Sequence, residues 1–263
     1  MKVAAKALLF GFLALALVPS HFATAQMGDA CVRIAYVYRT MHWVSHLRNA
    51  YQGVVGESKE LERVLAQMDA SAKTFKAIEA DVIWDQFQKV INETDTEQGK
   101  IYCRRENGEI QMAVDFTAPD KKYVIYSGGK VQVYQPKIDQ VNEYLPGKNR
   151  GEVESFLVLG FGGSGHDLYK SYGVRFVKTE TVAGVAADEL ELIPKSDRLR
   201  NNIARILLWI DSAKGVMVQQ QLFEPGGDYR LAKYSDIKSV SKLPDNIFKL
   251  KTTAKTKFVS PQD

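Results

Sequence analysis

The spacing of apolar residues changes early in the chain from a helical period to an extended one. A first group recurs at steps of three and four, as on one face of an amphipathic helix: Leu61, Val64, Leu65, Met68, Ala72 and Phe75. A second group recurs at every other position, as on one face of a strand: Ile78, Ala80, Val82 and Trp84. The pattern therefore predicts a helix followed by a strand, each with one face that must be covered.

Residues 116–136 predict a β-hairpin. Two β-rich runs, residues 123–126 and 131–134, flank the turn sequence Ser-Gly-Gly-Lys. Glycine reaches positive φ without a steric penalty, so Gly128 and Gly129 allow the chain to reverse between the two runs.

Further strand-like runs, bounded by turn residues, predict a meandering antiparallel sheet. They are residues 99–104, 110–117, 141–145, 173–180, 187–193, 205–211, 216–223, 229–239 and 248–253, with a helical interruption at 152–159. Successive hairpins behind one long helix favour a sheet that curls toward a barrel, with the helix on its concave face. No long linker divides residues 57–259, so we expect them to form a single domain.

The first 25 residues have the features of a cleaved signal peptide. Lys2 and Lys6 precede an apolar run at residues 7–18, and a small-x-small motif follows at residues 23–25. The apolar run is shorter than the roughly 20 residues of a membrane-spanning helix. Residues 26–56 form an N-terminal extension that is either an amphipathic helix or disordered. We therefore expect export to the periplasm.

Charge and cysteine content limit the partner classes. The 263 residues carry a formal net charge of +4, and removal of Lys2 and Lys6 with the signal peptide lowers it by two. A nearly balanced charge with interspersed signs gives no basis for nucleic-acid binding. Cys31 and Cys103 could form one disulfide in an oxidising compartment, or remain two free thiols.

The sequence contains no convincing catalytic, metal or cofactor motif. Ser164, His166 and Asp167 have the residue types of a catalytic triad, but neighbours in sequence rarely converge their side chains. The glycine-rich run around Ser164 lacks the Lys-Ser/Thr ending of a phosphate-binding loop and fits a hinge better. His42 and His46 lack the glutamate of a zinc-protease motif. We therefore expect no enzymatic activity, no metal and no cofactor.

Aromatic side chains are better candidates for a binding surface. Core packing accounts for most of them, but some could line an apolar cavity: Trp84, Phe116, Tyr126, Tyr134, Phe156, Phe161, Trp209 and Phe223. A shift of one residue in register reverses the face of every side chain on a strand, so the sequence leaves open which of them point inward.

Several segments follow one another in a characteristic order: ELERVLAQMDASAKTFKAIEADVIW, GKIYCRR, FTAPDKKYVIYSGGKVQVYQPKIDQV and LPDNIFKLKT. This order, over residues 60–253, resembles the periplasmic outer-membrane lipoprotein carrier family, the LolA/LolB-like proteins. The resemblance implies an α+β fold, a strongly curved antiparallel half-barrel, or incomplete β-barrel, with an N-terminal helix and short lid helices over its concave apolar face. It also implies that the protein shields acyl chains without covalent chemistry.

The resemblance implies a latch for the lid as well. Carriers of this family hold the closed lid with an arginine that follows the aromatic strand, and Tyr102-Cys103-Arg104-Arg105 stands at this place. Arg105 is therefore the implied latch and Arg104 the alternative, with residues 152–172 as the lid. The sequence departs from the family in its extension at residues 26–56 and in Glu-Asn-Gly, which replaces a proline after the basic pair.

Two functions follow from this resemblance. The first is a monomeric periplasmic carrier of acylated lipoproteins or other lipids, which receives cargo from an inner-membrane release complex and delivers it to an outer-membrane acceptor. The second is an envelope regulatory or assembly module, which uses the same half-barrel to sense lipid or a partner protein. Both predict an apolar cavity, and they differ in what fills it.

Overall fold

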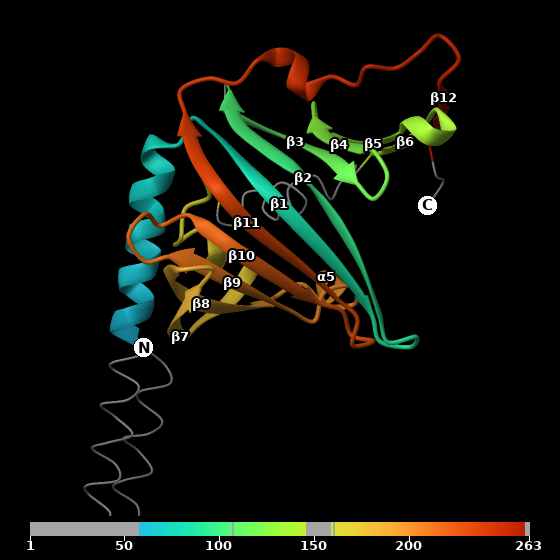
Figure 1. Ribbon diagram of the computed structural model, residues 1–263. Helices are drawn as coiled ribbons and strands as arrows, with labels where there is room; N and C mark the ends of the chain where they lie inside the picture. The colour runs from blue at the N-terminus through green and yellow to red at the C-terminus, as the bar shows by residue number, and fades with distance from the viewer. Residues whose placement is uncertain (1–57, 107, 146–158, 160, 261–263) are drawn as a thin grey trace, which may run out of the picture. The chain divides into compact units, whose positions relative to one another are not determined.

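The computed structural model describes residues 58–106, 108–145, 159 and 161–260 (Figure 1). The chain divides into two compact units, Met1–Gly53 and Val54–Asp263. The first unit lies outside the described residues, as do the predicted signal peptide and the whole extension at residues 26–56. The following description concerns the second unit.

Twelve strands form one open sheet in the order β12-β6-β5-β4-β3-β2-β1-β11-β10-β9-β8-β7. Every neighbouring pair is antiparallel except β12 and β6, which are parallel. The sheet is curved but does not close, because β7 and β12 remain as its edges. The predicted α+β half-barrel is confirmed. The strands are β1 (Ala77–Gln88), β2 (Glu93–Glu106), β3 (Glu109–Ala118), β4 (Lys122–Ser127), β5 (Lys130–Gln135), β6 (Gln140–Tyr144), β7 (Tyr172–Val182), β8 (Val185–Pro194), β9 (Arg205–Asp211), β10 (Met217–Phe223), β11 (Tyr229–Val240) and β12 (Lys257–Val259).

The described helices are few, and all but one are short. Residues 58–74 are helical and form the long helix beside the sheet in Figure 1. The others are η1 (Pro136–Ile138), α4 (Leu168–Ser171), α5 (Asp197–Arg200) and η3 (Asp245–Phe248). The helical interruption predicted at residues 152–159 lies outside the described residues except for Leu159, which is in a turn and buried.

Helix 58–74 covers one part of the inner face of the sheet. Its predicted apolar stripe is buried, with Val64, Leu65 and Met68 almost inaccessible to solvent. Beside this stripe, Arg63 Nη2 lies 2.9 Å from Asp188 Oδ1 of β8, and Gln67 Nε2 donates to the Ser212 carbonyl after β9 at 2.6 Å. These polar contacts fix the helix over the end of the sheet that contains β8 and β9.

The predicted period of two in β1 matches the burial of its side chains. Ile78, Ala80 and Val82 are buried and belong to the main core under the helix, whereas Ile83 is 40% exposed. The alternation of apolar and polar residues therefore predicts correctly which face of β1 points inward.

The predicted hairpin is present as β4 and β5, with a turn shorter than expected. Ser127 and Lys130 pair across the strands, so only Gly128 and Gly129 form the turn. Their φ values are +60° and +76°, as a two-residue hairpin turn with both central residues at positive φ requires.

The strand predicted at residues 248–253 is wrong. Phe248 ends η3 and is buried on the outer face of the sheet, in a cluster with Ala113, Ile125 and Leu243. Its apolar character thus serves packing on that face and not strand pairing. The last strand is instead β12, which pairs with β6 through Lys257, Phe258 and Val259.

Leu208 provides a test of the core. Its side chain is fully buried in the centre of β9, so Leu208→Ala should lower the free energy of unfolding by about 2–5 kcal/mol, through lost burial and the cavity that remains. Denaturant titration measures the change. Leu145→Ala, at a position that is 67% exposed, should change it by less than about 0.5 kcal/mol, and equal effects of the two substitutions would contradict the described core.

Candidate functional site

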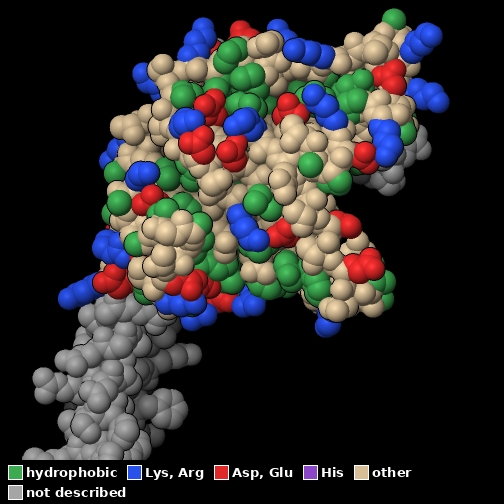
Figure 2. All heavy atoms as spheres, viewed as in Figure 1, with side chains coloured by type: hydrophobic (Ala, Val, Ile, Leu, Met, Phe, Trp, Pro, Cys, Tyr) green, Lys and Arg blue, Asp and Glu red, His purple; other side chains and the backbone are tan. Residues whose placement is uncertain are grey.

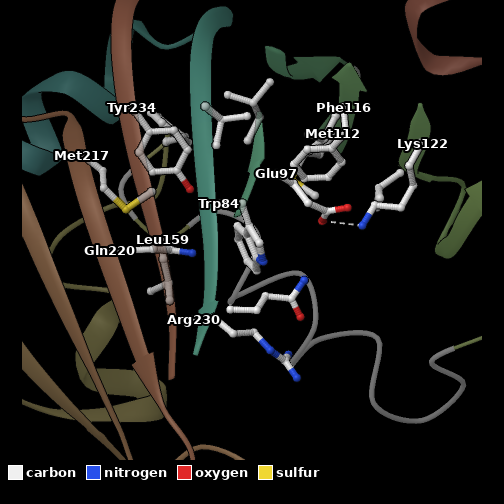
Figure 3. Close-up of a pocket in the computed structure, with 16 residues that line it drawn as sticks. Trp84, Glu97, Met112, Phe116, Lys122, Leu159, Met217, Gln220, Arg230 and Tyr234 are labelled. Atoms are coloured by element: carbon white, nitrogen blue, oxygen red, sulfur yellow. Dashed lines mark hydrogen bonds and ion pairs between the residues drawn. The ribbon is translucent and has the colours of Figure 1, made fainter. Parts of the chain in front are cut away.

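A cavity of about 260 Å³ lies on the inner face of the sheet, at the part that helix 58–74 leaves uncovered. Figure 3 shows its labelled side chains pointing into a common space between the strands. The apolar lining comes from β1 to β4, from β10 and β11, and from the segment after residue 158: Val82, Trp84, Ile101, Met112, Val114, Phe116, Val124, Leu159, Phe161, Met217 and Tyr234. The lining therefore suits a ligand with an extended apolar part.

Five polar side chains also line the cavity: Gln86, Glu97, Lys122, Gln220 and Arg230. Lys122 Nζ donates to Glu97 Oε2 at 2.5 Å and lies 4.7 Å from the centroid of the Phe116 ring. Arg230 Nη2 lies 2.9 Å from Glu224 Oε1. Because these charges are paired, the polar part of the lining offers hydrogen-bonding groups without an isolated charge.

Three of the predicted aromatic residues line this cavity, namely Trp84, Phe116 and Phe161. Phe161 packs edge-on against Tyr234, with the ring centroids 4.9 Å apart. Phe156 lies outside the described residues.

The other four predicted aromatic residues do not line the cavity. Trp209 belongs to a separate cluster on the outer face, and its Nε1 donates to Glu180 Oε1 at 2.7 Å. Phe223 lies under the Arg205 guanidinium, 4.2 Å from the ring centroid. These assignments were wrong because both residues have odd positions on strands whose even positions, such as Leu208 and Leu222, point inward.

Tyr134 and Tyr126 are the remaining corrections. Tyr134 stacks on Tyr123, with 6.1 Å between the ring centroids, and its hydroxyl donates to Asp139 Oδ1 at 3.0 Å. Tyr126 is fully buried but is not among the cavity residues. The aliphatic residues and methionines of the lining were missed, and the signal that could have found them is their alternation in phase with Trp84 and Phe116.

Arg104 and Arg105 point to opposite faces of β2, since neighbouring side chains on a strand alternate. Arg104 is buried on the outer face, where it donates to Gln111 Oε1, to the Leu243 carbonyl and to Asp245 Oδ1, at 2.7, 3.1 and 2.6 Å. The guanidinium also lies over the Phe248 ring at 4.4 Å. Arg104 therefore fastens the segment after β11 to the sheet.

Arg105 reaches the segment that covers the cavity. Its Nη2 donates to the Gly162 carbonyl at 2.7 Å, one residue after the cavity-lining Phe161. Gly162 has a φ of +77°, and a Cβ there would collide with the Phe75 ring. This glycine thus permits a close approach to the end of helix 58–74, and Arg105 holds the segment at that point.

A second polar contact joins the same segment to the helix. Asp69 Oδ1 accepts from Ser164 Oγ at 2.5 Å, and Asp69 Oδ2 lies 2.5 Å from His166 Nδ1. His166 Nε2 lies 3.1 Å from Glu62 Oε1. Ser164 is thus bonded to a carboxylate and not to His166, so the arrangement of a nucleophile with its base is not assembled.

The pKa shifts of His166 and Asp69 favour the charged form of each side chain. Hydrogen bonds to Asp69 and then to Glu62 raise the pKa of His166 above its ordinary value of 6.5. Burial alone would raise the pKa of Asp69, but hydrogen bonds from Ser164 and His166 lower it. The histidine cation and the carboxylate therefore stabilise each other.

Cys103 is a free thiol in the core, with 1% of its surface exposed. Burial raises its pKa to about 12, so the thiol remains protonated and unreactive at neutral pH. Cys31, the other cysteine of the predicted pair, lies outside the described residues.

Two further features bear on the class of site. Among the described residues, no group of three or more His, Cys, Asp or Glu side chains is placed to hold a metal ion. None of the helices in the described part of the chain has both the length and the apolar character needed to cross a bilayer.

The sheet is open and curved, a helix and a loop cover parts of its inner face, and an apolar cavity lies on the same face. These features define a class of cavity-bearing half-barrels. Residues 65–251 match the family described as outer membrane lipoprotein carrier protein LolA. This match covers well over half of the chain, which belongs to the LolA family. The sequence has no significant match among curated proteins.

Solved structures with a similar fold have low sequence identity to this chain. MucB is 12% identical with a TM-score of 0.47, over 74% of this chain and 64% of MucB, so the chain spans less than two thirds of MucB. The LolA superfamily protein NE2245 from Nitrosomonas europaea is 14% identical with a TM-score of 0.38, over 72% and 97% of the two chains. Lipoprotein LppX from Mycobacterium tuberculosis is 11% identical with a TM-score of 0.39, over 69% and 98%.

The His166 contact predicts a pH dependence. Because the pKa of His166 is raised in the folded protein, its stabilising contribution is complete below the unfolded pKa and is lost as the pH rises through the folded pKa. His166→Gln should therefore destabilise the protein more at about pH 6 than at about pH 9. Thermal unfolding at both pH values measures this. Lys170→Gln, which removes a cation from the same segment, should change the thermal stability by the same amount at both pH values. If the effect of His166→Gln on stability is equally independent of pH, the His166 contact is contradicted.

Proposed function

We propose that this protein is a periplasmic carrier that shields the acyl chains of lipoproteins, or of another lipid, on the way to the outer membrane. The observation that carries the proposal is the apolar cavity beneath a segment fastened by Arg105. Membership of a family described as lipoprotein carriers supports the same function. An inner-membrane release complex would supply the cargo, and an outer-membrane acceptor would receive it.

The physics of such a cavity suits a carrier. Each methylene transferred from water contributes roughly 0.8 kcal/mol, so an acyl chain binds without specific polar contacts. Release requires a competing state, and the covering segment would supply one by moving Leu159 and Phe161, which line the cavity, into its space. A closed empty state lowers the apparent affinity for cargo and allows transfer to an acceptor.

Cargo recovered from the periplasm tests the proposal. Mass spectrometry of the purified protein should detect acylated proteins, and Met112→Gln should reduce their amount roughly tenfold, because it places an amide in the apolar lining at nearly constant volume. Recovery of a non-acylated partner protein, equal for parent and variant, would favour the regulatory or assembly module instead. The absence of both cargo and partner under mild extraction would count against the carrier.

Arg105 is the proposed latch. Arg105→Leu removes the hydrogen bond to the Gly162 carbonyl and weakens the closed empty state. Since a hydrogen bond contributes about 0.5–1.5 kcal/mol, the affinity for fatty acid should rise roughly three- to tenfold. Titration with a fluorescent fatty acid measures the affinity.

Arg104→Leu is the matched control for the latch. It should lower the free energy of unfolding by about 1–3 kcal/mol, because it leaves the polar partners of Arg104 on the outer face unsatisfied. It should not change the affinity for fatty acid. If Arg105→Leu binds fatty acid with the parent affinity, Arg105 is not the latch.

A further inference from the structure

The turn between β1 and β2 projects two adjacent aliphatic side chains into solvent. Val90 is 96% exposed, the highest value among the exposed large hydrophobic side chains of the described residues, and Ile91 is 55% exposed. Single exposed apolar residues are common on protein surfaces, but a neighbouring pair at the tip of a long hairpin is unusual and indicates a contact site.

The turn is held in place by the neighbouring hairpin of β10 and β11. The Lys89 amide donates to Asp228 Oδ1 at 2.9 Å, and the rings of Phe87 and Tyr229 stack with their centroids 4.8 Å apart. The two turns lie side by side in Figure 1. The exposure of Val90 and Ile91 therefore belongs to a supported part of the fold.

This tip lies beyond the end of the cavity that Gln86 and Arg230 line, and these two residues pair across β1 and β11. Val82, Trp84 and Gln86 follow one another along the inner face of β1 and all line the cavity. β1 ends at Gln88, two residues beyond Gln86, and Val90 lies in the turn that follows. Arg230, which also lines the cavity, is the second residue of β11 and follows the turn of the neighbouring hairpin.

We propose that the β1–β2 turn inserts Val90 and Ile91 into the apolar layer of a lipid bilayer and so docks the end of the cavity lined by Gln86 and Arg230 at the membrane surface. Two side chains on a narrow turn cannot supply the roughly 800 Å² that each partner buries in a stable protein interface. A bilayer requires no such complementary surface, and the gain scales with buried apolar area.

The charges around the tip determine which membranes it accepts. Lys89 and Arg230 lie beside Glu93 and Asp228, so both signs are present at the turns. Figure 2 shows the same mixture of basic and acidic side chains over the visible face. Insertion therefore depends on apolar contact and does not require anionic lipid. This inference extends the proposed function, because it brings a cavity for acyl chains to the membrane that receives them.

Flotation with phosphatidylcholine vesicles tests the inference on the exported, purified protein. The double variant Val90→Ser and Ile91→Ser should bind vesicles at least about tenfold more weakly than the parent. The matched control, Ile138→Ser with Leu145→Ser, removes two side chains of comparable exposure, 57% and 67%, and should bind as the parent does. Thermal unfolding should show that both variants fold.

A second variant reports on insertion directly. The added fluorescence of Val90→Trp should shift to shorter wavelength with vesicles and be quenched by brominated phosphatidylcholine, whereas Leu145→Trp should show neither effect. Vesicle binding by the tip variant equal to that of the parent, or the absence of quenching in Val90→Trp, would overturn the inference. Loss of a protein partner with unchanged vesicle binding would also overturn it.

A further measurement distinguishes failure of membrane docking from failure of the proposed carrier function. Binding of a fluorescent fatty acid in the absence of vesicles reports on the cavity alone, and it should be equal in the parent, the tip variant and the control. Fatty-acid binding with no effect of the tip on vesicle binding would reject membrane docking and leave the carrier intact. Membrane binding through the tip by a protein that takes up no fatty acid would reject the carrier and leave the docking site.

Discussion

The inner face of an open sheet is apolar and has to be removed from water, and most features of this protein follow from how that is done. A closed barrel would bury the face on itself, but here β7 and β12 remain separate edges. Helix 58–74 covers one part, and the segment containing Leu159 and Phe161 covers another. The covering is incomplete, and the remaining space is the cavity.

The two covers are fastened by polar contacts that differ in strength and chemistry. The helix is joined to the sheet through a nearly inaccessible carboxylate, Asp188. The segment over the cavity is held by the exposed Arg105 and by His166, whose contacts lie at the surface. Surface contacts contribute little free energy each, so burial of Leu159 and Phe161 in the core supplies most of the free energy that holds this segment over the sheet.

Neighbouring residues of β2 stabilise opposite faces of the sheet. Arg104 stabilises the outer face and Arg105 the inner one, although both carry the same charge. Along β1, the inner positions run from core to cavity and end near the exposed turn at Val90. The hairpin thus connects the apolar site to the most exposed apolar point on the described surface.

The sequence by itself determined the order of helix and strands, the inward face of β1 and the Gly128–Gly129 turn, because periodicity and turn chemistry are local properties. The family resemblance drew attention to Arg105, which donates to the Gly162 carbonyl. It did not determine that Trp209, Phe223 and Tyr134 face outward, because strand register depends on pairing with distant strands. Nor did it identify Asp69 as the partner of Ser164 and His166. Those contacts join residues almost a hundred positions apart, and only the packing of the helix against the folded sheet brings them together.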